Sequence, residues 1–296
     1  MLPNKQKKNF FDKRHFPRDT DLEMIRCPLC GSDSTCIIHV RKPFQVVHCN
    51  NCSLSYLNPR LKEPVMNRVY GGGKYFSDGD MTGYRDYTSQ EKSLRITFRR
   101  FLSELRRRGF ASGRILEVGC GYGYFLDEAR DFFPYLFGTE LSPEAAAHAR
   151  TLPGIAIHTG DMDSLPAGWD NFDITITINV IEHIYKPLEF IIALKQTLKA
   201  SGRIVVATPD FGSFWYKILG GNWPSFKIPE HVAFYTGKTL RLLLKKAGFR
   251  DIREIPFRHV FPIGLVTGKF GLNIGGRLGQ IPVGIPKTMI AFSAQK

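Results

Sequence analysis

The stretch RILEVGCGYGYF, residues Arg114–Phe125, decides the fold. It begins with an apolar run, Arg114–Val118, that is typical of a buried β-strand. Three glycines follow at alternate positions: Gly119, Gly121 and Gly123. Glycines at such a place let the backbone turn sharply and approach a ligand closely. The stretch therefore predicts a strand that turns, through a ligand-binding loop, into a helix.

An acidic residue further along the chain extends this pattern. Glu140 ends the next predicted strand, 21 residues after Gly119. A carboxylate at that place can accept hydrogen bonds from both hydroxyls of a ribose. The loop differs from the nicotinamide-binding pattern, which requires a glycine where this chain has Tyr124. We therefore expect a ligand with a ribose at the ends of these strands.

Strands and helices alternate through the rest of the chain. Strands are expected at Arg114–Val118, Tyr135–Glu140, Ile155–Thr159, Phe172–Asn179 and Arg203–Thr208, with two late strands at Asp251–Pro256 and Thr288–Ala294. Helices are expected at Tyr124–Phe132, Pro143–Thr151, Pro187–Ala200 and Lys238–Ala247. Apolar strands separated by helices predict an α/β fold with a mostly parallel sheet and helices on both faces.

Composition divides the chain into four parts. Residues 1–24 are polar and basic and are expected to form a flexible arm. Residues 25–59 contain four cysteines, and residues 60–113 form a linker or cap that ends in an Arg-rich helix. A capping-box pattern at Thr88–Glu91 opens this helix. Residues 114–296 form the ligand-binding domain.

The four cysteines form two C-x2-C pairs separated by eighteen residues: Cys27, Cys30, Cys49 and Cys52. This spacing is typical of a zinc ribbon, in which each pair directs two thiolates at one ion. Four thiolates fill a tetrahedral Zn²⁺ and leave no open position, so the predicted site is structural. Redox pairs or thiols without metal are the alternative. A ribbon of this kind either binds nucleic acid or braces a neighbouring domain.

Five segments in order resemble the class I S-adenosylmethionine-dependent methyltransferases. They are ILEVGCGYG (Ile115–Gly123), GTELS (Gly138–Ser142), GDMDSLP (Gly160–Pro166), FDITITINVIEHIYKP (Phe172–Pro187) and GRIVVATPD (Gly202–Asp210). The resemblance covers about residues 84–296. It implies a Rossmann-like sheet of seven strands with the last antiparallel, and S-adenosyl-L-methionine as cofactor.

The same resemblance implies which residues hold the cofactor. Glu117 and Gly119 would lie beside its methionine part, Glu140 would hold the ribose, and Asp161 the adenine amino group. The full set adds neighbouring loop residues and a capping segment before the domain: Glu117, Gly119, Gly121, Gly123, Glu140, Leu141, Asp161, Met162, Asn179, Tyr84 and Tyr87.

A second group of residues is expected at the reacting end: Glu182, His183 and His231. They resemble a motif of methyltransferases that act on hydroxyls of quinone precursors, sugars and small RNAs, in which they help to bind a divalent metal. Asn179 stands here in place of the first glutamate of that motif. A histidine with a pKa near 6.5 is also a suitable general base for a hydroxyl. Catalysis by His231 or His183, metal binding and a purely structural role all remain open.

Nearby aromatic side chains are expected either to line the acceptor pocket or to pack under a lid: Phe214, Trp215, Trp223 and Phe226.

Charge is unevenly distributed along the chain. The formal net charge is +14, yet residues 115–198 carry −8, and each flanking part carries +11. The acidic part suits a cofactor with a sulfonium cation and several hydrogen-bond donors. The basic parts favour an anionic acceptor.

Four functions follow, in order of preference. The first is O-methylation of a small molecule, a glycan or a nucleotide-linked sugar. The second is RNA methylation that uses the ribbon and the basic surface. The third is methylation of a lipid-linked acceptor at a membrane surface, because His259–Pro286 is apolar, rich in glycine and flanked by basic residues. The fourth is binding without catalysis.

The sequence also favours a location. It has no run of eighteen uncharged apolar residues, and its start lacks the apolar stretch of a signal peptide. We therefore expect a cytoplasmic protein with reduced thiols, with peripheral membrane contact as the alternative. The sequence predicts no oligomeric state.

Overall fold

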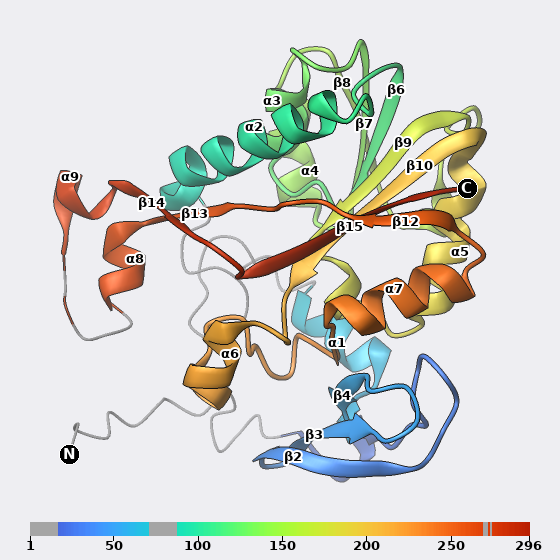
Figure 1. Cartoon of the computed structure of the whole chain (residues 1–296), viewed down its shortest axis with the longest axis vertical. Coiled ribbons are helices and arrows are strands. Elements are labelled where there is room, and N and C mark those ends of the chain that lie inside the picture. Colours follow the sequence, from blue (N-terminus) through green and yellow to red (C-terminus); the bar gives the residue numbers. More distant parts are fainter. Residues whose placement is uncertain (1–16, 71–87, 269–271, 273) are drawn as a thin grey trace.

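The computed structural model describes residues 17–70, 88–268, 272 and 274–296. Its centre is a seven-stranded sheet in the order β12-β15-β10-β9-β6-β7-β8 (Figure 1). The strands are β6 (Arg114–Val118), β7 (Tyr135–Glu140), β8 (Ile155–Thr159), β9 (Phe172–Ile178), β10 (Leu198–Pro209), β12 (Arg250–Glu254) and β15 (Met289–Gln295). Strands β6 to β10 pair in parallel, whereas β15 is antiparallel to both of its neighbours. The predicted α/β fold is confirmed.

Helices cover both faces of this sheet. One face packs against α2 (Glu91–Arg107), α3 (Tyr124–Ala129) and α4 (Pro143–Arg150), and the other against α5 (Pro187–Thr197) and α7 (Gly237–Lys246). Successive residues of a strand point to opposite faces, so Ile115 joins the first core and Leu116 the second. Burial on both faces explains why β6 and β15 are largely apolar, whereas the edge strand β12 is exposed and charged.

Strand β10 begins earlier than the sequence pattern predicts. The pattern continues a helix through Ala200 and starts the strand at Arg203, whereas the strand already begins at Leu198. Leu198 pairs with Phe172 of β9, and the register then shifts before Arg203. Pairing with the neighbouring strand thus prevails over the weak local preference for helix.

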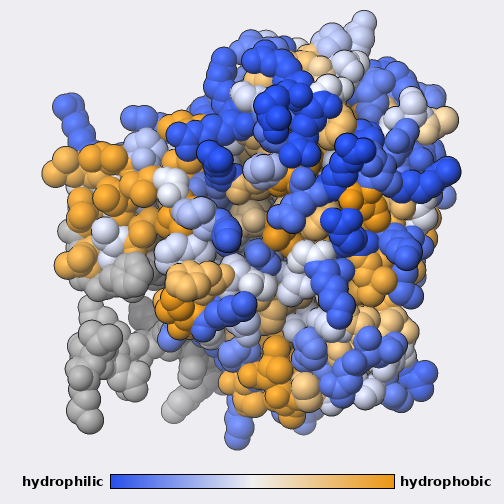
Figure 2. Space-filling view, in the orientation of Figure 1, coloured by the Kyte–Doolittle hydropathy of each residue, from blue (hydrophilic) through white to orange (hydrophobic). Residues whose placement is uncertain are grey.

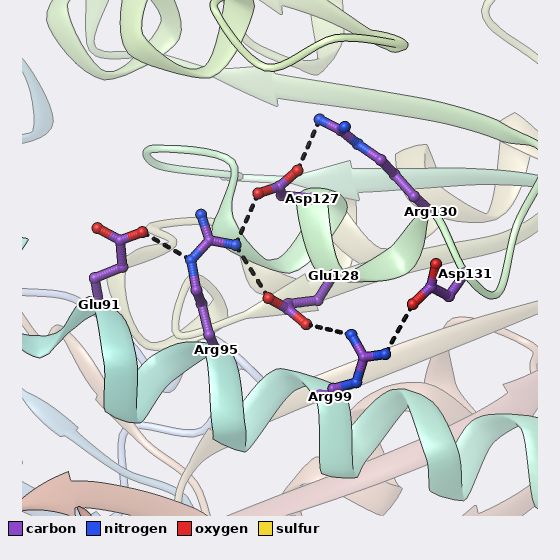
Figure 3. Close-up of polar contacts among 7 residues, drawn as sticks. All are labelled: Glu91, Arg95, Arg99, Asp127, Glu128, Arg130 and Asp131. Atoms are coloured by element: carbon purple, nitrogen blue, oxygen red, sulfur yellow. Dashed lines mark hydrogen bonds and ion pairs between the residues drawn. The ribbon is translucent and has the colours of Figure 1, made fainter.

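Ion pairs join the long helix α2 to α3 (Figure 3). Arg95 contacts Asp127 at 2.7 Å and Glu128 at 3.0 Å. One turn further along, Arg99 contacts Glu128 at 3.0 Å and Asp131 at 2.8 Å. These arginines of α2 therefore face acidic partners within the same domain.

The cysteine segment forms a small sheet that a strand from the main domain completes. The strand order is β11-β4-β3-β2, with β2 (Thr35–Arg41), β3 (Phe44–Cys49), β4 (Ser55–Leu57) and β11 (Ala233–Phe234). Leu54 and Tyr56 of this segment are buried in the same core as Leu240 and Leu243 of α7. The ribbon is therefore packed directly against one face of the domain (Figure 1).

Two predicted segments before the domain are described in part. Within the predicted arm, β1 (Leu22–Glu23) pairs with β5 (Arg60–Leu61), so the end of the arm belongs to a small sheet. Helix α1 (Glu63–Tyr70) follows β5. The rest of the predicted cap before residue 88, with Tyr84 and Tyr87, lies outside the described residues.

The glycine-rich segment near the C-terminus forms a lobe beside the sheet (Figure 1). It contains β13 (His259–Pro262), α8 (Ile263–Gly268), α9 (Gly276–Gly279) and β14 (Pro282–Ile285). Helix α6 (Phe214–Leu219) follows β10. Within the described ranges, none of the helices has the length and apolar character needed to cross a bilayer.

Candidate functional site

The predicted cofactor loop lies between β6 and α3. Its three glycines have φ angles of +77°, +53° and +80°, which other residues rarely adopt: Gly119, Gly121 and Gly123. A Cβ atom on Gly119 would lie 2.5 Å from Cγ2 of Val180. The amide groups of Gly119 and Cys120 both donate to the carbonyl oxygen of Thr139, each at 2.9 Å. These contacts fix the loop at the carboxyl edge of the sheet, where such folds bind ligands.

Glu140 is held in place by backbone donors. Its Oε2 accepts from the Gly121 amide and its Oε1 from the Ser142 amide, both at 2.8 Å. Burial raises the pKa of this carboxyl, although the two backbone hydrogen bonds act in the opposite direction. Each carboxylate oxygen accepts more than one hydrogen bond, so both retain acceptor capacity. The geometry suits a pair of ribose hydroxyls.

Glu117 presents a buried acceptor that nothing in the described chain satisfies. The side chain is buried, and its Oε2 has no hydrogen-bond partner among the described residues. Burial, and after it the charge of Glu140, raises the pKa of Glu117 well above its usual value. An unpaired buried oxygen is costly unless a ligand supplies a donor. The ammonium group of S-adenosylmethionine is such a donor, so the residues fit this cofactor.

The other predicted cofactor residues follow the ends of β7, β8 and β9. Leu141 is exposed, and Asp161 accepts from the Ser164 amide at 3.2 Å, next to Met162. Asn179 has a φ of +56°, a conformation that asparagine tolerates better than most residues. The sheet therefore brings these four residues to one edge, and their contacts with the cofactor remain a prediction.

The residues predicted at the reacting end lie close together. Glu182 and His183 belong to a short 3-10 turn, Ile181–His183, after β9, and His231 lies on the loop after α6. One ligand atom from each of Glu182, His183 and His231 lies within 4.8 Å of the others. Glu182 is buried and its Oε2 accepts from the hydroxyl of Thr208 at 2.9 Å. Burial raises the pKa of Glu182 to about 7.

Both histidines are held in the neutral form. Their rings meet edge to face, with centroids 4.7 Å apart. Nδ1 of His183 lies 3.1 Å from the carbonyl oxygen of Glu230, so Nδ1 carries the hydrogen and Nε2 the lone pair. Burial, and after it the charge of Lys227, lowers the pKa of His183 to about 3. Burial, and then His183, lowers the pKa of His231 well below its usual value.

These shifts correct the expectation of a histidine with a pKa near 6.5. The pKa values of both imidazoles are depressed because the domain and the ribbon enclose them. They are strong proton acceptors only when a negative charge lies beside them, such as ionised Glu182 or a developing oxyanion.

Lys227 is a residue at this site that the sequence pattern did not single out. Its positive charge acts on Glu182, His183 and His231, and its carbonyl oxygen accepts from the His231 amide at 2.7 Å. The donor set of one carboxylate and two imidazoles suits a divalent metal. The charge of Lys227 opposes a second cation there. In the sequence, only its position between Phe226 and His231 indicates that Lys227 lies near the site.

The predicted pocket aromatics divide into two groups. Trp223 and Phe226 are buried, and Trp223 lines a narrow cleft that His231 also borders. Phe214 is exposed and borders a larger cavity of about 400 Å³, while Trp215 donates to the carbonyl oxygen of Pro286 at 2.7 Å. The larger cavity lies at the carboxyl ends of β10 and β12, with Asp210, Ser213, Lys217, Glu254 and Lys287 in its wall.

The four predicted zinc ligands form one cluster. The Sγ atoms of Cys27 and Cys52 are 3.4 Å apart, and those of Cys30 and Cys49 are 3.5 Å apart. All four sulfurs lie within 4.8 Å of one another, and none forms a disulfide. Tetrahedral Zn²⁺ with bonds of about 2.3 Å requires sulfurs about 3.8 Å apart. The cluster therefore fits a zinc ribbon, and Cys36, exposed on β2, lies outside it.

The ribbon is hydrogen-bonded to the loop that carries His231. Strand β11 pairs with β4, Ala233 opposite Tyr56. The Leu57 amide donates to the Val232 carbonyl, and the Val232 amide donates to the Glu182 carbonyl, both at 2.9 Å. Val232, the residue after His231, thus connects the ribbon both to the loop of His231 and to the turn that contains Glu182.

Comparison with known families gives one clear match. Residues 90–254 match the family described as methyltransferase domain. The matched range contains the cofactor loop, Glu140 and the reacting-end cluster. It ends at the last residue of β12.

Individual relatives are more distant. An uncharacterized protein of Methanocaldococcus jannaschii is 28% identical over 58% of this chain and 83% of its own length. A ubiquinone biosynthesis O-methyltransferase of Cereibacter sphaeroides is 28% identical over 48% of this chain. The match spans 62% of that relative's length. The crystal structure of a magnesium protoporphyrin IX methyltransferase from Synechocystis, with bound S-adenosylhomocysteine, superposes with a TM-score of 0.52. It is 13% identical, and the match covers 79% of this chain and all of that one.

Proposed function

The chain belongs to the methyltransferase domain family and is a class I S-adenosylmethionine-dependent methyltransferase, and we propose that it methylates a hydroxyl of a small molecule or glycan. The observation that supports a hydroxyl acceptor is the cluster of Glu182, His183 and His231, of which Glu182 and His231 are buried and His183 is half-buried. A hydroxyl must lose a proton as it attacks, and this cluster offers neutral imidazoles to receive it. The O-methyltransferase name of one relative supports the same assignment.

The cofactor site positions one reactant. When bound, S-adenosylmethionine supplies a methyl group on a sulfonium sulfur. A nucleophile can attack this methyl carbon directly, and the sulfur then leaves as the thioether of S-adenosylhomocysteine. Glu140 orients the ribose, and Glu117 accepts from the ammonium group of the methionine part. The glycine loop allows the backbone to contact the ligand closely. Fixing the methyl group in line with the acceptor is the main contribution of these residues.

The cluster of Glu182, His183 and His231 accepts the proton that the hydroxyl loses. We assign Nε2 of His183 or a ring nitrogen of His231 as the receiving atom, because both imidazoles are neutral around pH 7. Ionised Glu182 strengthens them as bases, since its negative charge stabilises an imidazolium. The ammonium of Lys227 stabilises an alkoxide forming beside it.

A variant at His231 tests this assignment. His231→Gln is expected to lower kcat by about 10²–10⁴-fold and to leave binding of S-adenosylhomocysteine unchanged. His48→Gln, which changes a histidine on β3 of the ribbon, is the matched control. Equal turnover in His231→Gln and His48→Gln would show that His231 does not take part in the proton transfer.

Metal at this cluster is the second arrangement that the residues support. The positive charge of Lys227 acts on the same three residues and would weaken the binding of a cation there. Turnover that requires added Mg²⁺ while the zinc content of the chain stays unchanged supports it. Turnover unaffected by a chelator supports proton transfer to histidine alone.

We assign a structural zinc to the four cysteines, with the ribbon as a brace. The support is the hydrogen bonding from β4 to the loop of His231, since a brace must contact what it holds. Thiols grouped in this way suit a reducing compartment, so we propose a cytoplasmic location.

RNA is a weaker candidate for the acceptor. The Arg-rich helix α2 would have to present free cations to phosphates. Arg107 pairs with Glu104 at 2.7 Å, and Arg95 and Arg99 pair with acids of α3 and of the turn after it. Of the arginines of α2, Arg100 and Arg106 are exposed without an ion pair to another described residue. The 400 Å³ cavity, whose wall holds Lys217 and Lys287 beside Asp210 and Glu254, better suits a small polar acceptor.

A further inference from the structure

The lobe formed by β13, α8, α9 and β14 carries many exposed apolar side chains. Fourteen large apolar side chains are exposed among the described residues, and seven of them belong to this lobe or to the adjacent helix α6. They are Phe214, Ile218, Leu265, Leu272, Ile274, Leu278 and Ile281. Figure 2 shows hydrophobic residues gathered over α6, α8 and α9. We call these seven side chains the apolar face.

The apolar face rests on a packed framework. A Cβ atom on Gly264 would lie 2.5 Å from the carbonyl oxygen of Ile274 and 3.1 Å from Cα of Gly279. Helix α8 therefore packs against α9 by direct backbone contact, with no room for side chains between them. The hydrogen bond from Trp215 to Pro286 ties α6 to the same lobe. Glycines fill the interior, and the large apolar side chains lie outside.

The charges within the lobe itself have one sign, whereas the acids Asp210 and Glu254 lie with Lys217 in the wall of the cavity beside α6. The chain has no acidic residue after Glu254. Four exposed basic side chains lie on or beside the lobe and form no ion pair with another described residue: Lys217, Arg258, Arg277 and Lys287. Apolar side chains among cations, in a lobe whose residues 255–296 include no acid, match the chemistry of an anionic lipid surface. Contact areas between proteins are instead depleted in lysine.

We propose that the apolar face docks on membranes that contain anionic phospholipid, with the leucines and isoleucines in the interface and the four cations against the headgroups. The lobe's helices are short, so the contact is peripheral. Phe214, Lys217 and Lys287 also line the 400 Å³ cavity. A docked molecule therefore holds the mouth of this cavity at the level of the headgroups. The inference goes beyond the proposed function and does not depend on which atom is methylated.

Vesicle flotation with the full-length chain tests the proposal. Phosphatidylcholine vesicles with and without phosphatidylglycerol are compared at low and high salt. The wild type is expected to float only with the anionic vesicles, and less at high salt, because the cations are screened. Leu265→Glu and Arg277→Glu are each expected to weaken the partition coefficient by about tenfold or more.

Two matched variants control for the change in charge. Ile192 on α5 is 39% exposed, against 43% for Leu265, so Ile192→Glu makes the same change elsewhere. Lys245→Glu, at the end of α7, matches Arg277→Glu. Both controls are expected to float like the wild type. All four variants are expected to bind S-adenosylhomocysteine normally, which separates this test from that of the proposed function.

Three results would overturn the proposal. The first is a wild type that does not float with anionic vesicles at low salt. The second is Leu265→Glu floating as well as Ile192→Glu. The third is a wild-type dimer in sedimentation that Leu265→Glu dissociates, without lipid binding, because the apolar face would then join two copies of the chain.

Discussion

Replacing Glu140 by glutamine tests the cofactor site most sharply. The carboxylate accepts two backbone amides at 2.8 Å and is assigned two ribose hydroxyls. Glutamine keeps the size but turns one acceptor into a donor, which then faces either the Gly121 amide or the Ser142 amide. At least one ribose hydrogen bond is also lost.

The magnitude follows from these contacts. A hydrogen bond to a charged group contributes about 1.5–3 kcal/mol, so losing one lowers affinity for S-adenosylhomocysteine by roughly 10- to 150-fold. Isothermal titration calorimetry gives the affinity and thermal unfolding the stability.

The control is Asp170→Asn, an exposed acid at the opposite edge of the sheet. Asp170→Asn should bind S-adenosylhomocysteine with the affinity of the wild type. Affinity of Glu140→Gln within twofold of the wild type, with the fold intact, would refute the assignment of Glu140 to the ribose.

Three further predictions concern the loop, the ribbon and the C-terminal lobe. Gly119→Ala places a Cβ against Val180 at a φ of +77° and should lower stability by about 1–3 kcal/mol in chemical unfolding and weaken cofactor binding; normal binding would contradict the assigned geometry. Cys27→Ser should lose the zinc found by elemental analysis and raise amide exchange at Val232, whereas Cys36→Ser should do neither; equal zinc in both would exclude the site. Burial lowers the pKa of His259 to about 4, so its contribution to stability should be constant above pH 6.5 and fall by up to about 3 kcal/mol towards pH 4. The difference between the wild type and His259→Asn measures this contribution, and parallel pH profiles of the two proteins would contradict it.

Local sequence patterns were sufficient to predict the first strand of the domain, the glycine loop after it and the zinc ribbon. The start of β6, the glycine turn and the two C-x2-C pairs depend on neighbours within a few residues. The expectation that the strands are parallel predicts one further feature, namely that their carboxyl ends lie at the same edge of the sheet. The position of Glu140 at the end of its strand predicts a ribose contact, whereas the roles of Asp161 and Asn179 are implied by the resemblance to class I methyltransferases.

Tertiary contacts explain what the sequence pattern missed. Strand β11 has two residues, and no local signal shows that Ala233 pairs with Tyr56. The depressed pKa values of His183 and His231 arise from burial by segments distant in sequence. Lys227 belongs to no motif, and its effect depends on the folded loop alone.

Transfer of a labelled methyl group tests the central claim most directly. The purified chain is incubated with S-adenosylmethionine labelled on its methyl group and with a panel of small-molecule, glycan and nucleotide-sugar acceptors, and products are identified by mass spectrometry. We predict a product methylated on oxygen, with transfer at least about a hundredfold slower in His231→Gln. Methyl transfer to nitrogen or carbon, or undiminished transfer by His231→Gln, would contradict the account.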